Sequence, residues 1–113
     1  MKLNLKEMIG EDCLAPTDGD RIYSIIHPEL LADRQVTLDF TAVRVVVSLF
    51  LNQAIGKLYA DVPPERIRAN MTVVGLNDPG KFALRRVVDN SKNYYADKNY
   101  RAAIDRSIDT LEA

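Results

Sequence analysis

Apolar and polar residues follow two different periods along this chain, and the shorter period predicts the strands. In the stretch QVTLDF every second residue is apolar, as expected for a strand that buries one face. The stretch NMTVVGL predicts a second, buried strand. Residues 1–9 alternate weakly and predict an edge strand, and a short strand is expected around Cys13-Leu14. The positions expected in central strands are Val36, Leu38, Phe40, Val73 and Val74.

Helical spacing of apolar residues predicts helices between these strands. The first helix is expected to begin at PTDGD with Thr17 as its cap, and to end or kink at His27, because Pro28 has no N–H. VPPE predicts a connection, and a later helix is expected to start at Asp78-Pro79. The inner face of that helix is expected to carry Leu84, Val87, Val88, Ser91 and Tyr95. A final amphipathic helix is expected over residues 97–113, with Tyr100, Ile104, Ile108 and Leu111 on one side.

The stretch VVVSLFLNQAIG, residues 45–56, changes its period at its single hydroxyl residue. Three valines suit a buried strand, and helical spacing then continues to about Ala60, with Leu51, Ile55 and Leu58 expected against the sheet. Ser48 lies where a helix N-cap belongs, so Ser48→Ala is expected to cost about 1 kcal/mol. Gly56 weakens a helix by about 1 kcal/mol relative to alanine, which predicts close packing of the helix on the sheet.

Composition narrows the class of protein. Alternating strands and helices predict an α/β fold with some parallel pairing, and 113 residues suffice for one domain. The formal net charge is −1 and the pI is near 5.8, which argues against binding nucleic acid through a broad basic field. The single cysteine excludes an internal disulfide and fits a reducing compartment. Lys2, Lys6 and Glu7 interrupt any signal-peptide pattern, and no apolar stretch has the length of a membrane span, so a cytoplasmic location is expected.

One stretch, GLNDPGKF at residues 75–82, fits the G-x-x-x-x-G-K pattern of a phosphate-binding loop between a strand and a helix. Phe82 stands where a Ser or Thr would hold magnesium, and Pro79 removes an N–H from the loop that would cradle phosphate. No strand is expected after it to carry a second acidic motif. The stretch therefore predicts a turn and a helix start, with neither ATP hydrolysis nor magnesium-dependent nucleotide binding.

Other catalytic or metal-binding chemistry has little support in the sequence. Cys13 and His27 are the only residues that resemble a nucleophile and a base, and nothing in the pattern brings them together. We expect Cys13 in the core and His27 at a surface turn. With one histidine and one cysteine, a zinc site within one chain is not expected. We therefore expect no enzyme activity, no cofactor and no bound metal.

The middle of the chain resembles a known family through several motifs taken in order. DFTAVRVVVSLFL, residues 39–51, resembles the core of STAS domains (sulphate transporter and anti-sigma factor antagonist), in which a strand leads through an apolar bridge to a serine that opens a helix. The match is closer to a divergent STAS-like branch. Its further motifs appear here as Asp18-Gly19, as LDF at 38–40, as Ser48 to Leu58, and as Arg86 to Tyr95. The resemblance covers about residues 10–96.

This resemblance implies a single STAS-like domain over residues 1–113, with a mixed sheet of about four strands covered by helices mainly on one face. It also implies a non-enzymatic regulatory module that binds another protein, for which a histidine-kinase-type ATPase is the candidate partner. In anti-sigma factor antagonists the first serine of the turn is phosphorylated, and Ser48 occupies the matching position. The apolar turn itself is the candidate interface, with Leu49, Phe50, Asn52 and Gln53 as candidate partner-binding residues.

Two alternatives stay open at this point. In the first, Phe50 is buried and Ser48 only caps the helix, so that the functional surface lies elsewhere. In the second, the domain binds a small molecule or a nucleotide, as some STAS domains are thought to do. The family resemblance does not name the partner, the ligand or the oligomeric state.

Overall fold

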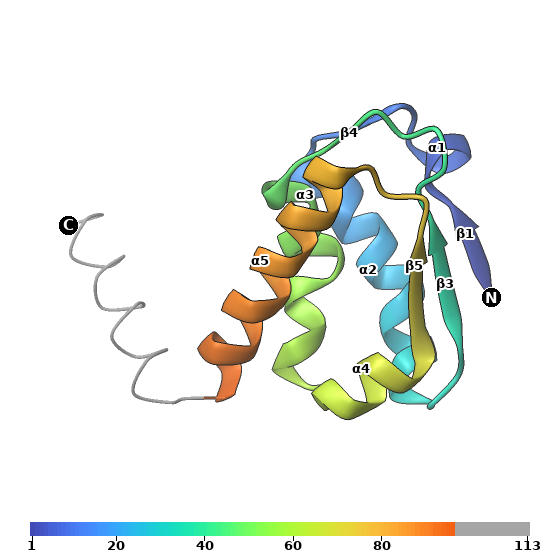
Figure 1. The fold of residues 1–113 in the computed structure, drawn as a ribbon. Helices are drawn as coiled ribbons and strands as arrows, with labels where there is room; N and C mark the ends of the chain where they lie inside the picture. Colours follow the sequence, from blue (N-terminus) through green and yellow to red (C-terminus); the bar gives the residue numbers. More distant parts are fainter. Residues whose placement is uncertain (97–113) are drawn as a thin grey trace.

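Strands and helices alternate along the chain, in agreement with the hydrophobic pattern (Figure 1). The computed structural model describes residues 1–96. The strands are β1 (Lys2–Asn4), β2 (Asp12–Cys13), β3 (Val36–Asp39), β4 (Val45–Val46) and β5 (Met71–Val74). The helices are α1 (Leu5–Met8), α2 (Pro16–Leu31), α3 (Ser48–Ala54), the 3-10 helix η1 (Gly56–Ala60), α4 (Pro64–Asn70) and α5 (Asp78–Ala96).

Three strands form a parallel sheet in the order β1-β3-β5, in which Leu3, Leu38 and Val73 lie side by side. Strands β2 and β4 form a separate parallel pair. The α/β class is confirmed, but the expectation of a mixed sheet of about four strands is wrong for residues 1–96. Each connection between paired strands contains at least one helix, and such crossovers join parallel strands.

The helices cover mainly one face of the sheet, as the family resemblance implied. Successive strands are added in one direction, and right-handed crossovers then place their connecting helices on the same side. Figure 1 shows α2, α3 and α5 together on that side of β3 and β5. On the other face, Lys2 Nζ lies 3.4 Å from a carboxylate oxygen of Asp39.

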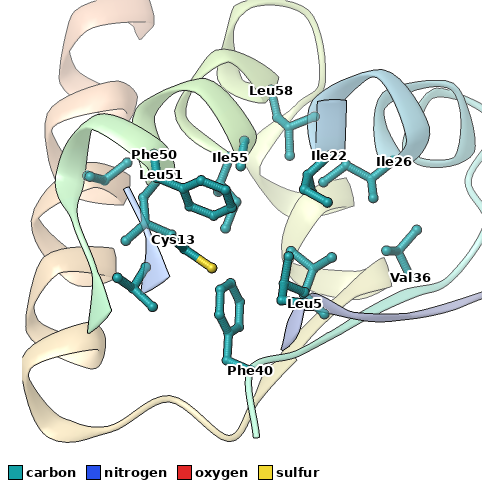
Figure 2. Packing of buried hydrophobic residues seen from close by; sticks show 14 of the residues in the cluster. Leu5, Cys13, Ile22, Ile26, Val36, Phe40, Phe50, Leu51, Ile55 and Leu58 are labelled. Carbon is teal, nitrogen blue, oxygen red and sulfur yellow. The ribbon is translucent and has the colours of Figure 1, made fainter. Parts of the chain in front are cut away.

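The core lies between the sheet and these helices (Figure 2). The period-two residues of β3 and the helical residues Leu51, Ile55 and Leu58 are buried, which confirms both expectations. Strand β5 differs from the prediction of a buried central strand. It lies at an edge of the sheet, and Val74 is 38% exposed. A run of apolar residues does not distinguish an edge strand from a central one.

Helix α2 corrects two expectations. It begins at Pro16 after Ala15, so Thr17 is not its cap. It also continues through Pro28 to Leu31 instead of ending at His27. The apolar face of α2 continues past the proline to the fully buried Leu30, and this burial compensates for the missing N–H.

Helices α3 and α5 lie where the sequence predicts helices, but α3 is shorter than predicted. The helix expected to run to about Ala60 is divided into α3 and η1. VPPE is more than a connection, because Pro64 occupies the first turn of α4, a position that proline suits. Helix α5 begins at Asp78 as expected. Val87 and Ser91 are buried on its inner face.

The expected final helix, residues 97–113, lies outside the described residues, so that prediction remains open. Within residues 1–96, none of the helices combines the length and the apolar character needed to cross a membrane.

Candidate functional site

The segment that leads into α3 is fixed by strand pairing and by one ion pair. Cys13 lies opposite Val46 in the β2–β4 pair, and the N–H of Val47 donates to the carbonyl of Cys13 at 3.2 Å. The Arg44 guanidinium donates to both carboxylate oxygens of Asp12, at 3.1 and 3.3 Å. These contacts set where the chain leaves β4 and where α3 begins.

Ser48 is the first residue of α3 and not its N-cap. The cap position belongs to Val47, whose backbone is extended (φ −105°, ψ 158°), and no side chain caps this helix end. The expectation that Ser48 caps the helix is therefore wrong by one residue. The side chain of Ser48 is exposed to solvent, so its hydroxyl is accessible.

The four candidate partner-binding residues fall on different faces of α3. Leu49 is 63% exposed and Asn52 is also exposed, while Gln53 is half-buried. Phe50 is completely buried, so the expectation that it projects toward a partner is wrong. Figure 2 shows Phe50 among the buried residues, near Leu51.

Phe50 is buried because α2 crosses α3 at very short range. A Cβ atom built on Gly19 would lie 2.5 Å from the carbonyl oxygen of Phe50 and 2.9 Å from Cβ of Gln53. Only glycine permits this approach, which turns one face of α3 into the core. In the Asp18-Gly19 motif, the glycine is therefore required for the close packing of α2 on α3.

Further exposed apolar side chains lie on the elements around the start of α3. Leu14 follows the β2 residue paired with β4, and Val45 belongs to β4 itself. Phe82 lies near the start of α5, and α5 contacts β4. The residues just before these two elements are joined by a 2.8 Å hydrogen bond from Asn77 Nδ2 to the carbonyl of Arg44. The sequence analysis did not predict that these residues are exposed, because apolar character alone does not predict exposure. We call the set of Leu14, Val45, Ser48, Leu49 and Asn52 the α3 surface.

An open groove of about 440 Å³ lies beside the α3 surface, between η1 and α5. Its lining from α3 and η1 includes Asn52, Gln53 and Lys57, and its lining from α5 includes Asn90 and Ser91. A Cβ on Gly56 would lie 2.8 Å from Ser91 Oγ. Gly56 therefore permits close packing of η1 on α5, and the expected contact with the sheet is wrong.

In the loop that resembles a phosphate-binding loop, backbone N–H groups donate hydrogen bonds to other atoms of the same loop. Asn77 Oδ1 accepts from the N–H of Gly80 at 2.9 Å, and the N–H of Lys81 donates to the carbonyl of Asn77. Gly75 has φ +80°, and a Cβ there would lie 2.5 Å from the backbone nitrogen of Thr41. The absence of nucleotide binding remains a prediction, and this geometry supports it.

Cys13 and His27 occupy separate environments. Cys13 is buried in the core, where desolvation, followed by the nearby Asp18 and Asp12 carboxylates, raises its pKa to about 11. His27 lies within α2 and not at a turn. Its Nε2 is 2.9 Å from both carboxylate oxygens of Asp61, and its ring stacks on Tyr23. The His27–Asp61 contact therefore joins α2 to the end of η1.

Within residues 1–96, no group of three His, Cys, Asp or Glu residues is placed so that it could hold a metal ion.

Comparison with known families gives one match. A family model described as a STAS-like domain of unknown function (DUF4325) matches residues 18–81, more than half of the chain. The matched span begins in α2 and includes β3, the whole of α3 and β5. Neither the curated proteins nor the solved structures contain a significant match to this chain.

Proposed function

Because the chain belongs to the STAS-like family, we propose that it is a non-enzymatic regulatory module that binds another protein through the α3 surface. The supporting observation is Leu49, which is 63% exposed in the first turn of α3 although its neighbours Phe50 and Leu51 are fully buried. A large apolar side chain held outward on a packed helix is a suitable anchor for a partner.

Ser48 is the proposed switch of this interface. Its hydroxyl is exposed and adjoins the Leu49 anchor, so a modifying enzyme has access to it. A phosphate adds nearly two negative charges and would have to be desolvated against an apolar partner surface. Phosphorylation would then release the partner without altering the core. The proposed partner is a histidine-kinase-type ATPase, and the support for this choice is the resemblance to anti-sigma factor antagonists alone.

The test uses a partner recovered with the tagged full-length chain from its native cell and then purified. Affinity is measured for the parent, Leu49→Ser, Ser48→Asp and the matched control Leu31→Ser. Leu31 is also an exposed leucine, at 42%, but lies at the far end of α2. We expect Leu49→Ser and Ser48→Asp each to weaken binding by about tenfold or more, and Leu31→Ser to have no effect.

Two results would contradict the proposal. Parent-like affinity of a folded Leu49→Ser would place the interface elsewhere. Parent-like affinity of a folded Ser48→Asp would remove the switch but keep the interface. Circular dichroism of each variant shows whether it is folded, so that weaker binding is not mistaken for unfolding.

The groove between η1 and α5 favours a second candidate function, the binding of a small polar molecule. Its lining offers the Asn52, Gln53 and Asn90 side-chain amides and the Ser91 hydroxyl, groups that donate and accept hydrogen bonds. Calorimetric titration with ATP, GTP and their nucleosides tests this alternative. Binding that Asn90→Ala abolishes and Leu49→Ser leaves intact would favour the ligand-binding function over the protein interface.

A further inference from the structure

The outer edge of β5 carries unpaired backbone groups. Val74 is bonded to β3, since its carbonyl accepts from the N–H of Phe40 at 2.8 Å. Successive residues of a strand direct their N–H and C=O groups to opposite sides, so those of Val73 point away from β3. In the part of the chain that the structure describes, β3 is the only strand beside β5.

This edge lacks two of the features that usually prevent strands from pairing with other chains, a charged residue and a proline. The four residues of β5, Met71 to Val74, include no charge and no proline. The opposite edge of the sheet differs, because β1 carries Lys2, whose side chain is 65% exposed beside Asp39. A charged residue of this kind discourages edge-to-edge pairing. The β5 edge is therefore the one suited to accept another strand.

A groove of about 370 Å³ runs between this edge and α5. Its apolar lining is half-buried and consists of Val73, Leu76, Leu84 and Val88. Three charged residues of α5, Lys81, Arg85 and Asp89, line it at intervals of four, which places them along one stripe of the helix. Figure 1 shows α5 beginning near the end of β5 and running back beside α3.

We propose that the β5 edge pairs antiparallel with the β5 edge of a second copy of this chain. A two-fold axis makes the contact self-complementary and sets the two α5 helices antiparallel to one another. With Arg85 on the axis, Lys81 of each copy faces Asp89 of the other, so two opposite-charge pairs form. One like-charged contact, Arg85 with its counterpart, lies at the axis, where both long side chains reach solvent. The formal net charge of −1 opposes the association of two copies only weakly.

The first test is the mass of the full-length protein in solution, by sedimentation equilibrium over a range of concentrations. We expect twice the 12.7 kDa of the chain. Val73→Pro removes an outward-facing N–H that β3 does not use, and we expect it to produce a monomer. The matched control is Lys2→Pro. Since the N–H of Thr37 donates to the carbonyl of Met1, the N–H of Lys2 also points away from β3, at the other edge, and this variant should remain a dimer.

A charge exchange tests the same interface without touching the strand. Lys81→Glu should weaken dimerisation by about tenfold or more, and the double variant Lys81→Glu/Asp89→Lys should restore it. Both residues are exposed, so folding is not at risk. A parent that stays monomeric up to its highest soluble concentration overturns the proposal. A dimer that neither Val73→Pro nor Lys81→Glu weakens also overturns it, because its interface would then lie elsewhere.

Discussion

The inner and outer faces of α3 differ in exposure although both carry large apolar residues. Phe50, Leu51 and Ala54 on the inner face are buried against α2 and the sheet. On the outer face, Ser48, Leu49 and Asn52 are exposed. Nothing in hydropathy separates Leu49 from Leu51; the approach of α2 at Gly19 decides which of them enters the core.

This difference teaches that stability and the proposed partner binding are separable on one helix of seven residues. Substitutions on the inner face should unfold the domain, and those on the outer face should leave it folded but unable to bind. The same separation explains how a phosphate could act on a partner without disturbing the fold.

The largest effect is expected from Phe50→Ala. Deleting a fully buried phenylalanine should lower the free energy of unfolding by about 3–5 kcal/mol, because it leaves a cavity in the core. Leu49→Ala, its neighbour on the outer face, should change stability by less than about 0.5 kcal/mol. Urea unfolding followed by circular dichroism measures both, and equal losses would show that the two faces are not distinct.

Gly19→Ala should have the next largest effect. The added methyl group would meet the backbone oxygen of Phe50, which cannot move without shifting α3, and should cost about 1–3 kcal/mol. Gly56→Ala is the matched control. Its methyl group first meets Ser91 Oγ, a side-chain atom that can rotate away, so the loss should be smaller. Thermal unfolding compares the two, and a larger loss at Gly56 would contradict the assigned contact.

The ionisation of the buried Cys13 makes the stability of the core depend on pH. Its pKa rises from 9.0 to about 11 in the folded protein, chiefly through desolvation by burial. The folded state then holds this proton more tightly than the unfolded state. Stability from this group is complete below pH 9.0 and is lost as the pH rises toward about 11.

The measurement is the free energy of unfolding against pH in that window, for the parent and for Cys13→Ala. We expect the alkaline loss to be shallower in the variant, because it lacks this group. The pKa of Tyr23 and that of Tyr59 are also raised, mainly by desolvation, so these residues contribute to the slope that remains. Identical slopes would show that Cys13 ionises equally in both states.

The smallest effect is expected from Ser48→Ala. Since no side chain caps α3 and Ser48 lies inside the helix, its removal should change stability by less than about 0.5 kcal/mol. This corrects the loss of about 1 kcal/mol that a capping serine would give. A loss of that size in urea unfolding would mean that the hydroxyl does cap the helix in solution.

Periodicity predicted the fold where one face of an element is buried along its whole length. The alternation of Val36, Leu38 and Phe40 located β3, and the spacing of Leu51, Ile55 and Leu58 located the buried face that follows Ser48. Capping residues and prolines predicted the ends of helices less well. Helix α2 begins one residue before Thr17, and Pro28 does not end it, because tertiary burial of Leu30 outweighs the missing N–H.

The candidate site was only partly predictable for a related reason. The sequence placed Ser48 and Leu49 at the start of a helix and identified them as exposed candidates. It did not separate Phe50 from them, since that depends on α2, which lies about thirty residues earlier in the chain. Nor did it predict that the start of α5 lies beside β4, because that contact is tertiary.

The most direct test of the α3 surface is site-specific photo-crosslinking in the native cell. A benzophenone amino acid replaces Leu49 in one full-length variant and Leu31 in another, so that two exposed leucines on different helices are compared. Irradiation followed by immunoblotting and mass spectrometry detects a covalent adduct with a partner protein. We expect one discrete adduct from position 49 that Ser48→Asp diminishes, and none from position 31. No adduct from position 49, or the same adduct from both positions, would contradict a partner-binding role for the outer face of α3.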